Sequence, residues 1–157
     1  MPLPVKIILS IAIVEALGFL SGFSTMSSLK TWYVDLQKPP GTPPNWIFGP
    51  VWTALYALIG LSFALVWHKA KPGPEKKQAL TLFVIQLVLN LAWTPTFFGA
   101  QQILAGLVII VLMAVMIYLT MRAFKKLVPM TFWLLLPYLL WVCYATYLTA
   151  GNFILNR

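Results

Sequence analysis

Five long apolar stretches, separated by short polar segments, set the pattern of this chain. They cover approximately residues 4–26, 46–67, 79–98, 103–121 and 128–150. Each has about the length, roughly 20 residues, that a helix needs to cross the hydrocarbon core of a bilayer. The connections between them are too short to hold a soluble domain. The pattern therefore predicts a single domain over residues 1–157, an all-α membrane protein built as a five-transmembrane-helix bundle.

The segment between the first two predicted helices, residues 27–45, interrupts the apolar pattern. It contains four prolines, Pro39, Pro40, Pro43 and Pro44. Because proline fixes φ and removes a backbone donor, this segment cannot cross hydrocarbon. The rings of Trp32, Tyr33 and Trp46 each combine an apolar body with a polar edge, which suits the membrane interface. We therefore expect a stiff, extended cap that these rings hold at the membrane surface.

One face of the third predicted helix carries two amides beside aromatic rings. This stripe consists of Gln86, Asn90, Trp93 and Phe97. The spacing of i, i+4, i+7 and i+11 places all four on one side of a helix. Amides on the lipid face are costly, so we expect the stripe to face the interior. Gln86 and Asn90 either join neighbouring helices by hydrogen bonds or line a pocket, and the spacing leaves both alternatives open.

Aromatic faces on the second and fifth predicted helices complement that stripe. Trp52 and Tyr56 lie four residues apart on the second helix. Tyr138, Trp141 and Ala145 share a face of the fifth, where the small alanine leaves space between large rings. Both faces are compatible with an ordinary aromatic core. They are equally compatible with a pocket under the cap, where flat indole faces would suit a large planar ligand.

Prolines near the ends and centres of two spans predict local distortions. Pro95 removes the donor that would bond the carbonyl of Leu91, so we expect a bend and a wider bundle at that end. Pro137 does the same to the carbonyl of Trp133 in the middle of the last span.

Glu15 is the one carboxylic acid within a predicted span. At that depth a carboxyl group is costly, so it should face protein or a cavity. It could be protonated and hydrogen-bonded to a neighbouring helix, or it could have a functional role. Gly18 and Gly22 share its face and predict a close helix contact, inside the chain rather than at a dimer seam.

Composition agrees with a membrane protein, with 61% hydrophobic and 9% charged residues. The net charge of +8 comes from cations at helix ends rather than from a basic stripe, so we predict no nucleic-acid partner. Lys and Arg concentrate on the side of the N-terminus and of the loops after the second and fourth helices. By the positive-inside rule this predicts a cytoplasmic N-terminus in a bacterial plasma membrane, with the cap outside. The single cysteine, Cys143, excludes an intrachain disulfide.

Conventional catalytic and metal-binding motifs are missing from the sequence. It contains no phosphate loop, no Cys-x-x-Cys and no nucleophile–base pair, and only three acidic residues. The single histidine, His68, lies at a helix end, which argues against haem ligation. We therefore expect no metal and no cofactor, and no standard hydrolase or redox enzyme.

Three motifs together resemble the translocator protein family, also called TspO, the tryptophan-rich sensory protein or the peripheral benzodiazepine receptor. The run W-Y-x-x-L-x-K-P-x-x-x-P-P-x-W-x-F-x-P-V-W-x-x-L-Y extends from Trp32 to Tyr56. Residues 90–93, N-L-A-W, are followed by Phe97 and Phe98. Residues 137–141, P-Y-L-L-W, are followed by A-T-Y-L at 145–148. The resemblance spans nearly the whole chain.

The resemblance implies a homodimer whose pocket lies beneath the loop joining the first two helices. Members of the family bind tetrapyrroles such as protoporphyrin IX, and also sterols and benzodiazepine-type drugs. Some bacterial members are implicated in light- and oxygen-dependent porphyrin breakdown, through tryptophans that match Trp52 and Trp141. We predict that the ligand-binding residues are Trp32, Trp46, Trp52, Tyr56, Asn90, Trp93, Phe97, Tyr138, Trp141 and Ala145. Ligand carboxylates would lie near Lys30 and Lys38.

Three functions follow, in order of preference. The first is a tetrapyrrole-binding transporter or sensor. The second is a photo-oxidative enzyme that degrades porphyrins with Trp52 and Trp141 as its catalytic residues. The third is a small proton-coupled exporter of aromatic cations, suggested by Glu15.

Overall fold

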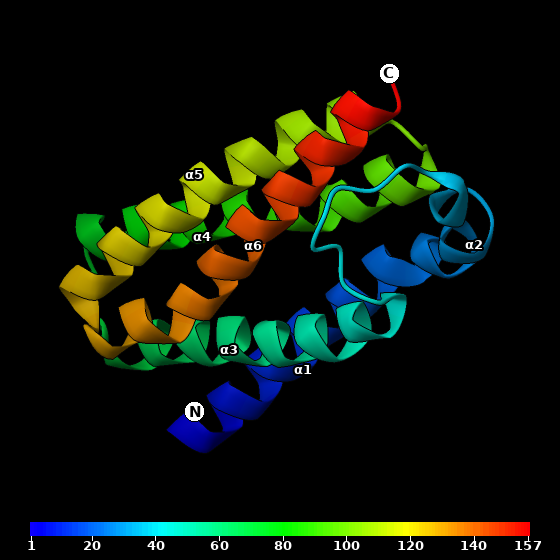
Figure 1. Cartoon of the computed structure of the whole chain (residues 1–157). Coiled ribbons are helices and arrows are strands. Elements are labelled where there is room, and N and C mark those ends of the chain that lie inside the picture. Colours follow the sequence, from blue (N-terminus) through cyan, green and yellow to red (C-terminus); the bar gives the residue numbers. More distant parts are fainter.

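Five long helices follow one another in the order that the apolar pattern predicts (Figure 1). The structure, a computed structural model, describes all 157 residues except the side chains of Ser24 and Met26. The long helices are α1 (Leu3–Ser21), α3 (Phe48–Lys69), α4 (Pro74–Thr94), α5 (Ile103–Leu127) and α6 (Met130–Leu155). All five are long and apolar enough to cross a membrane, and no strand occurs among the described residues. The predicted fold class, an all-α integral membrane bundle, is confirmed.

The helix ends differ from those expected. The first apolar stretch is divided into α1, a 3-10 turn (η1, Gly22–Ser24) and the short α2 (Thr25–Lys30). Gly22, a weak helix former, marks the division. At the other end of the bundle α5 extends six residues beyond the expected 121, to Leu127. Lys and Arg side chains can reach water from a helix that continues past the hydrocarbon, so charge does not end it.

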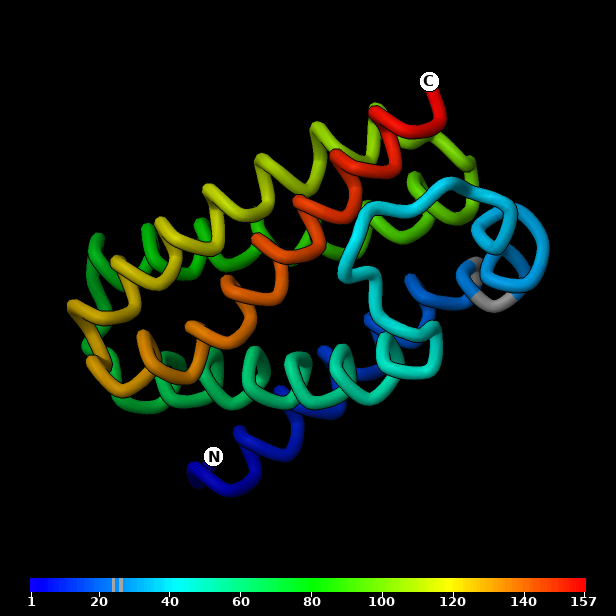
Figure 2. The backbone as a smooth tube through the Cα atoms, in the orientation of Figure 1, coloured from blue at the N-terminus to red at the C-terminus, as the bar shows by residue number. Residues whose placement is uncertain are grey.

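The long helices pack as a closed ring (Figures 1 and 2). Around the ring, α1 contacts α3, α3 contacts α6, α6 contacts α5, α5 contacts α4, and α4 returns to α1. The alternating direction of the helices brings the ends of α1, α4 and α6 to the same side as the starts of α3 and α5. The segment that joins α1 to α3 crosses the bundle at this side, which we call the cap side.

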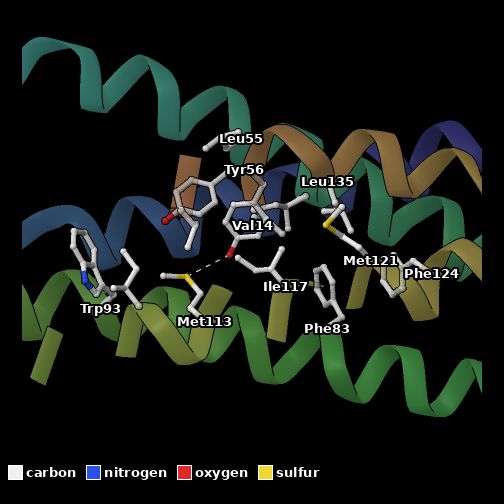
Figure 3. Close-up of a cluster of buried hydrophobic side chains, with 14 of the residues drawn as sticks. Val14, Leu55, Tyr56, Phe83, Trp93, Met113, Ile117, Met121, Phe124 and Leu135 are labelled. Atoms are coloured by element: carbon white, nitrogen blue, oxygen red, sulfur yellow. Dashed lines mark hydrogen bonds between the residues drawn. The ribbon is translucent and has the colours of Figure 1, made fainter. Parts of the chain in front are cut away.

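Large side chains fill the bundle on the side away from the cap (Figure 3). Phe83 of α4 stacks on Phe124 of α5, with ring centroids 5.8 Å apart and an interplanar angle of 10°. Met121 and Leu135 are buried in the same cluster. Because this half of the interior is closely packed, the open volume of the bundle lies in its other half.

Glycines bring α1 and α3 into close contact at two levels. A Cβ on Gly60 would lie 2.7 Å from the Cα of Ile11, and one on Gly18 would lie 2.3 Å from Cε2 of Tyr56. The expectation that Gly18 packs inside the chain is confirmed. The close contact expected at Gly22 is wrong, since Gly22 caps the end of α1 and no atom lies within 4 Å of its Cβ position.

A tight turn in the cap is fastened to α6. Gly41, with φ of +87°, follows Pro40, the order of residues that a type II turn requires. The hydroxyl of Tyr147 donates to the carbonyl of Pro40 (2.7 Å), and that of Tyr144 donates to the carbonyl of Gly41. The cap is therefore held by side chains of the last transmembrane helix.

The chain before that turn is anchored near the end of α6. The side-chain amide of Asn156 bonds both backbone groups of Gln37, accepting from its N–H at 2.9 Å and donating to its carbonyl at 2.8 Å. Pro39 is buried against Gly151, where a Cβ would lie 2.6 Å from the proline ring. A side chain larger than hydrogen at 151 would push the cap away from the bundle.

Candidate functional site

A cavity of about 590 Å³ lies beneath the cap. Its walls come from the cap segment and from α1, α3, α4 and α6, whereas α5 contributes none of the lining residues. Aromatic side chains form much of the wall, among them Tyr33, Phe48, Trp52, Tyr56, Trp93, Phe97 and Trp141. The cavity occupies the part of the bundle interior near the cap that the packed core does not fill.

Six of the ten predicted ligand-binding residues line this cavity. They are Trp52, Tyr56, Trp93, Phe97, Trp141 and Ala145. The first two project from α3 and the last two from α6, with Trp93 on α4 and Phe97 in the π-turn that follows it (η4, Pro95–Gly99). The structure thus brings together side chains from segments almost a hundred residues apart.

Four predicted residues lie elsewhere. Asn90 and Tyr138 are buried behind the wall, and neither lines the cavity. Trp32 packs edge-on against Phe97, with centroids 5.4 Å apart, and supports the wall from outside. Trp46 is 73% exposed and does not line the cavity. Its place before α3, in the turn η3 (Asn45–Ile47), suits the interfacial role also predicted for it.

A chain of hydrogen bonds runs behind the wall. The hydroxyl of Tyr56 donates to Oδ1 of Asn90 (2.8 Å), and Nδ2 of Asn90 donates to the hydroxyl of Tyr138 (2.7 Å). That hydroxyl in turn donates to Oε1 of Gln86 (2.7 Å). Sδ of Met113 lies 3.7 Å from the same hydroxyl, the interaction drawn at Met113 in Figure 3. Two roles were expected for Gln86 and Asn90, hydrogen bonds between helices or a place in the pocket wall. The structure shows the first, because both amides join neighbouring helices and neither lines the cavity.

The distortion predicted at Pro95 is present. The π-turn η4 follows α4, and the hydroxyl of Ser21, at the end of α1, donates to the carbonyl of Leu91 at 2.7 Å. The carbonyl that proline leaves without its helical donor is thereby satisfied from a neighbouring helix. This bond joins α1 to α4 at the level of the cavity.

Tyr33 does not lie at the membrane interface as predicted. It is 3% exposed and lines the cavity. The centroid of its ring lies 5.4 Å from that of Phe98 and 6.4 Å from that of Phe97. The ammonium of Lys38 lies 4.8 Å from the centre of its ring. Burial, and secondarily the neighbouring Tyr144, raises the pKa of Tyr33 to about 12, so its hydroxyl keeps its proton at physiological pH. Amphipathic rings suit an interface and a capped cavity equally, which is why sequence reasoning misplaced it.

Several lining residues were not predicted. Phe48 lies one turn before Trp52 on the same face of α3, and its ring centre is 6.2 Å from that of Trp141. Thr149 and Asn152 continue the Trp141 face of α6 and also line the cavity. Helical spacing could have found all three, since each is four, eight or eleven residues from a predicted member.

On one side the cavity reaches the lipid-facing surface, between α1 and α3. Phe19 and Phe23 line it and are nevertheless 69% and 68% exposed, and Thr53 on α3 is also exposed. Gly22 and Gly49, which face this gap, have no atom within 4 Å of their Cβ positions. The two helices that are close at Gly18 have therefore diverged at this level, and the divergence gives the cavity a lateral mouth.

The charge of the site comes from one residue. Glu15 lines the cavity and has no hydrogen bond or ion pair with any described residue. Lys30 and Lys38 lie in the cap and do not line it. The ammonium of Lys38 donates to the carbonyls of Val34 and Leu36, at 3.3 and 3.2 Å. Among the described residues no group of three His, Cys, Asp or Glu side chains could hold a metal.

Known proteins resemble this chain in sequence over most of its length. The sequence profile of the TspO/MBR family matches residues 10–154, which include every lining residue of the cavity. The chain is 40% identical over 151 residues to the tryptophan-rich protein TspO of Archaeoglobus fulgidus, covering 96% of this chain and 97% of that protein. It is 43% identical over 140 residues to the tryptophan-rich protein TspO of Chlorobaculum tepidum, covering 89% of each. The translocator protein of Homo sapiens is 42% identical over 116 residues, 73% of this chain and 69% of that protein.

Proposed function

The chain belongs to the TspO/MBR family, and from this membership and the cavity beneath its cap we propose that it binds tetrapyrroles such as protoporphyrin IX. Sterols and benzodiazepine-type drugs are further ligands of the same kind, flat and hydrophobic. The protein acts on them as a transporter or a sensor, the two activities after which its relatives are named.

The observation that supports this proposal is a roomy, aromatic cavity inside a membrane bundle. Its volume of about 590 Å³ lies within the range of roughly 300 to 1,000 Å³ typical of small-molecule sites. Aromatic faces gain most from contact with an extended planar ring, which buries a large apolar area at once. A hydrophobic molecule dissolved in the bilayer could reach these faces through the lateral mouth between α1 and α3.

Each wall has a distinct part in the proposed complex. Trp52 and Trp141 present indoles from α3 and α6, and Ala145 on the latter helix leaves room for the ligand between larger side chains. The cap closes the site on the aqueous side, since its backbone is bonded to Tyr147 and Tyr144 of α6. Porphyrin carboxylates would lie best toward the cap and away from Glu15, because like charges repel.

Titration of protoporphyrin IX against the purified protein tests the proposal. Binding is followed by the change in porphyrin absorbance, a signal that does not depend on the number of indoles. We expect saturable binding, and a loss of affinity of about tenfold or more in a Trp52→Phe, Trp141→Phe double variant, because each phenyl ring covers less of the ligand than an indole and loses about 0.5 to 1.5 kcal/mol of contact.

A second double variant provides the matched control. Trp46 and Trp133 are 73% and 65% exposed and do not line the cavity, so their replacement by Phe removes the same number of indoles without touching the site. Equal affinity in the two double variants would contradict the proposed role of Trp52 and Trp141. No saturable binding by the native protein would contradict the tetrapyrrole function itself.

A second candidate function is light-dependent porphyrin degradation. It is favoured by the position of Trp52 and Trp141, two oxidisable indoles that line the cavity together. Illumination in air of the porphyrin complex should then give a product with a new absorption spectrum, at a rate that falls in the Trp52→Phe, Trp141→Phe variant. The same spectral change in free porphyrin and in the complex would remove this candidate.

We also propose that the protein forms a homodimer. The small residues Gly18, Gly60 and Ala64 are not available for its interface, because the two glycines are covered within the chain and Ala64 is fully buried. The dimer would form through other lipid-facing surfaces of the bundle. Its presence can be measured by light scattering of the purified protein.

A further inference from the structure

The ionic character of the cavity is unusual for a site that binds hydrophobic molecules. Glu15 is the one acidic residue among the described lining residues, and these include no Lys, Arg or His. The carboxyl group has no hydrogen-bond or ion-pair partner among the described residues. A polar group with no protein partner, facing a space large enough for a ligand, is a group that a ligand can satisfy.

Helix geometry places this carboxyl group beside aromatic rings. Gly18, one turn further along α1, is so close to Tyr56 that a Cβ there would overlap the ring. Residues 15 and 18 share a face of the helix, so Glu15 projects toward the part of the cavity that contains Tyr56 and, one turn before it on α3, Trp52. The rings of these two residues lie 5.5 Å apart and are tilted by 32°.

A carboxylate beside electron-rich ring faces is a typical arrangement for recognition of an organic cation. The face of an indole or phenol ring attracts a cation within about 6 Å of its centre. A carboxylate in a space of low dielectric constant is costly unless a positive charge lies nearby. The basic groups of the cap do not supply that charge, because neither Lys30 nor Lys38 lines the cavity, and Lys38 is bonded to backbone carbonyls and lies over the ring of Tyr33.

We propose that Glu15 forms a cation subsite of the cavity, which raises the affinity for a flat hydrophobic molecule with a protonated or quaternary amine above that for a neutral molecule of the same shape. The carboxylate pairs with the ammonium group, Tyr56 and Trp52 contact it through their ring faces, and the remaining aromatic wall holds the apolar body. This inference rests on the proposed function in one respect, that hydrophobic ligands occupy this cavity. It adds that a positive charge placed beside Glu15 strengthens binding, whereas ligand carboxylates would lie at the cap end of the cavity.

A matched pair of ligands tests the subsite. One is biphenyl with a trimethylammonium group, and the other is biphenyl with a tert-butyl group, which has nearly the same shape and no charge. Neither molecule titrates, so only the charge differs. Calorimetric titration of the native protein in neutral nanodiscs should give an affinity at least about tenfold higher for the cation, since charge-assisted contacts are the stronger ones.

Two variants assign the preference to Glu15. Glu15→Gln should bind the two ligands with equal affinity, within about twofold. Glu75→Gln removes the same charge from an exposed position at the start of α4, outside the cavity, and should keep the full preference. If Glu15→Gln does not fold, Glu15→Leu, which suits a membrane helix better, gives the same comparison.

The outcomes separate this inference from the proposed function. Equal binding of the two ligands by the native protein, or an undiminished preference in the Glu15 variants, would overturn the cation subsite. A clear preference without any binding of protoporphyrin IX would support the subsite and contradict the tetrapyrrole function. Binding of protoporphyrin IX without a preference for the cationic ligand would support the tetrapyrrole function and contradict the subsite. Failure to bind any of the three molecules would overturn both.

Discussion

Asn90 uses its side chain to join three helices at once. Its oxygen accepts from Tyr56 on α3 and its nitrogen donates to Tyr138 on α6, while the residue itself belongs to α4. Gln86, one turn earlier, accepts from the same hydroxyl of Tyr138. Buried amides and phenols bond to each other in this way because no water is available to them, although Nε2 of Gln86 has no hydrogen-bond partner among the described residues. The network forms the support behind the aromatic wall.

Replacement of Asn90 by leucine should therefore destabilise the bundle. It leaves the hydroxyl of Tyr56 without its acceptor and the hydroxyl of Tyr138 without one donor. Each buried polar group that loses its partner lowers the free energy of unfolding by about 1 to 3 kcal/mol. We expect a lower midpoint of thermal unfolding in detergent, followed by circular dichroism. Val88→Ala, on the exposed face of the same helix, should leave the midpoint unchanged. Equal stability of Asn90→Leu and the native protein would show that the network is not structural.

At the scale of elements, the contact between α1 and α3 decides where the cavity opens. The helices are close at Ile11 and Gly60 and again at Gly18 and Tyr56, and beyond Gly18 they separate. Small residues permit the approach because helix axes in a membrane are held together by packing and not by exclusion of water. The mouth of the cavity begins where this packing ends.

Two glycines of α1 and its following turn give a matched comparison. In Gly18→Ala the new Cβ would lie 2.3 Å from the ring of Tyr56, which must move and weaken its bond to Asn90. We expect a loss of about 1 to 3 kcal/mol of stability, typical of overpacking, and weaker ligand binding. Gly22→Ala adds the same methyl group to the cavity wall where no atom lies within 4 Å, and should leave stability unchanged. A Gly18→Ala protein as stable as Gly22→Ala would contradict the close contact.

The cap is a second element whose attachment can be tested. A Tyr147→Phe, Asn156→Ala variant removes three hydrogen bonds that hold the cap to the end of α6. Each is worth about 0.5 to 1.5 kcal/mol, so we expect ligand dissociation to become at least about tenfold faster while the helical content stays constant. Stopped-flow displacement of bound porphyrin measures the rate. Tyr118→Phe, on the exposed face of α5, is the control, and equal dissociation rates would show that the cap does not retain the ligand.

At the scale of the whole molecule, the two sides of the bundle differ in charge and in role. The side opposite the cap carries the basic loops, and Lys6 of α1 meets His68 there, with its ammonium 3.3 Å from Nδ1 and 5.0 Å from the ring centre of Trp67. The cap side holds the cavity. We propose that the basic side is cytoplasmic, by the positive-inside rule.

Cysteine labelling tests this orientation. In a Cys143→Ser background, Thr42→Cys places a thiol in the cap and Lys71→Cys places one in the loop before α4. A thiol reagent that does not cross membranes should label the first in intact cells and the second only after permeabilisation. The opposite pattern would place the cap in the cytoplasm.

Much of the fold follows from the sequence because helices in a membrane form locally. Every backbone donor within a span is satisfied inside its own helix, so apolar length alone predicts the five helices. Helical spacing likewise identifies which residues share a face, and it correctly grouped Trp52 with Tyr56 and Trp141 with Ala145. Proline chemistry predicted the non-helical stretch 36–44 of the cap and the loss of the helical donor to the carbonyl of Leu91. It did not predict that residues 27–30 of the expected cap belong to α2 and residues 33–35 to a 3-10 turn.

The depth of each side chain was decided only by the tertiary structure. Spacing shows that a residue faces inward, but whether it reaches the cavity depends on how far its helix lies from the others, which no local pattern contains. Asn90 faces inward but does not line the cavity, because it lies behind Tyr56, to which it is hydrogen-bonded. Tyr33 of the cap is buried and lines the cavity, and Glu15 also lines it. The cavity lies where α1 and α3 diverge beyond Gly18. That is a property of the relative placement of helices, and it arises from contacts between residues far apart in the chain.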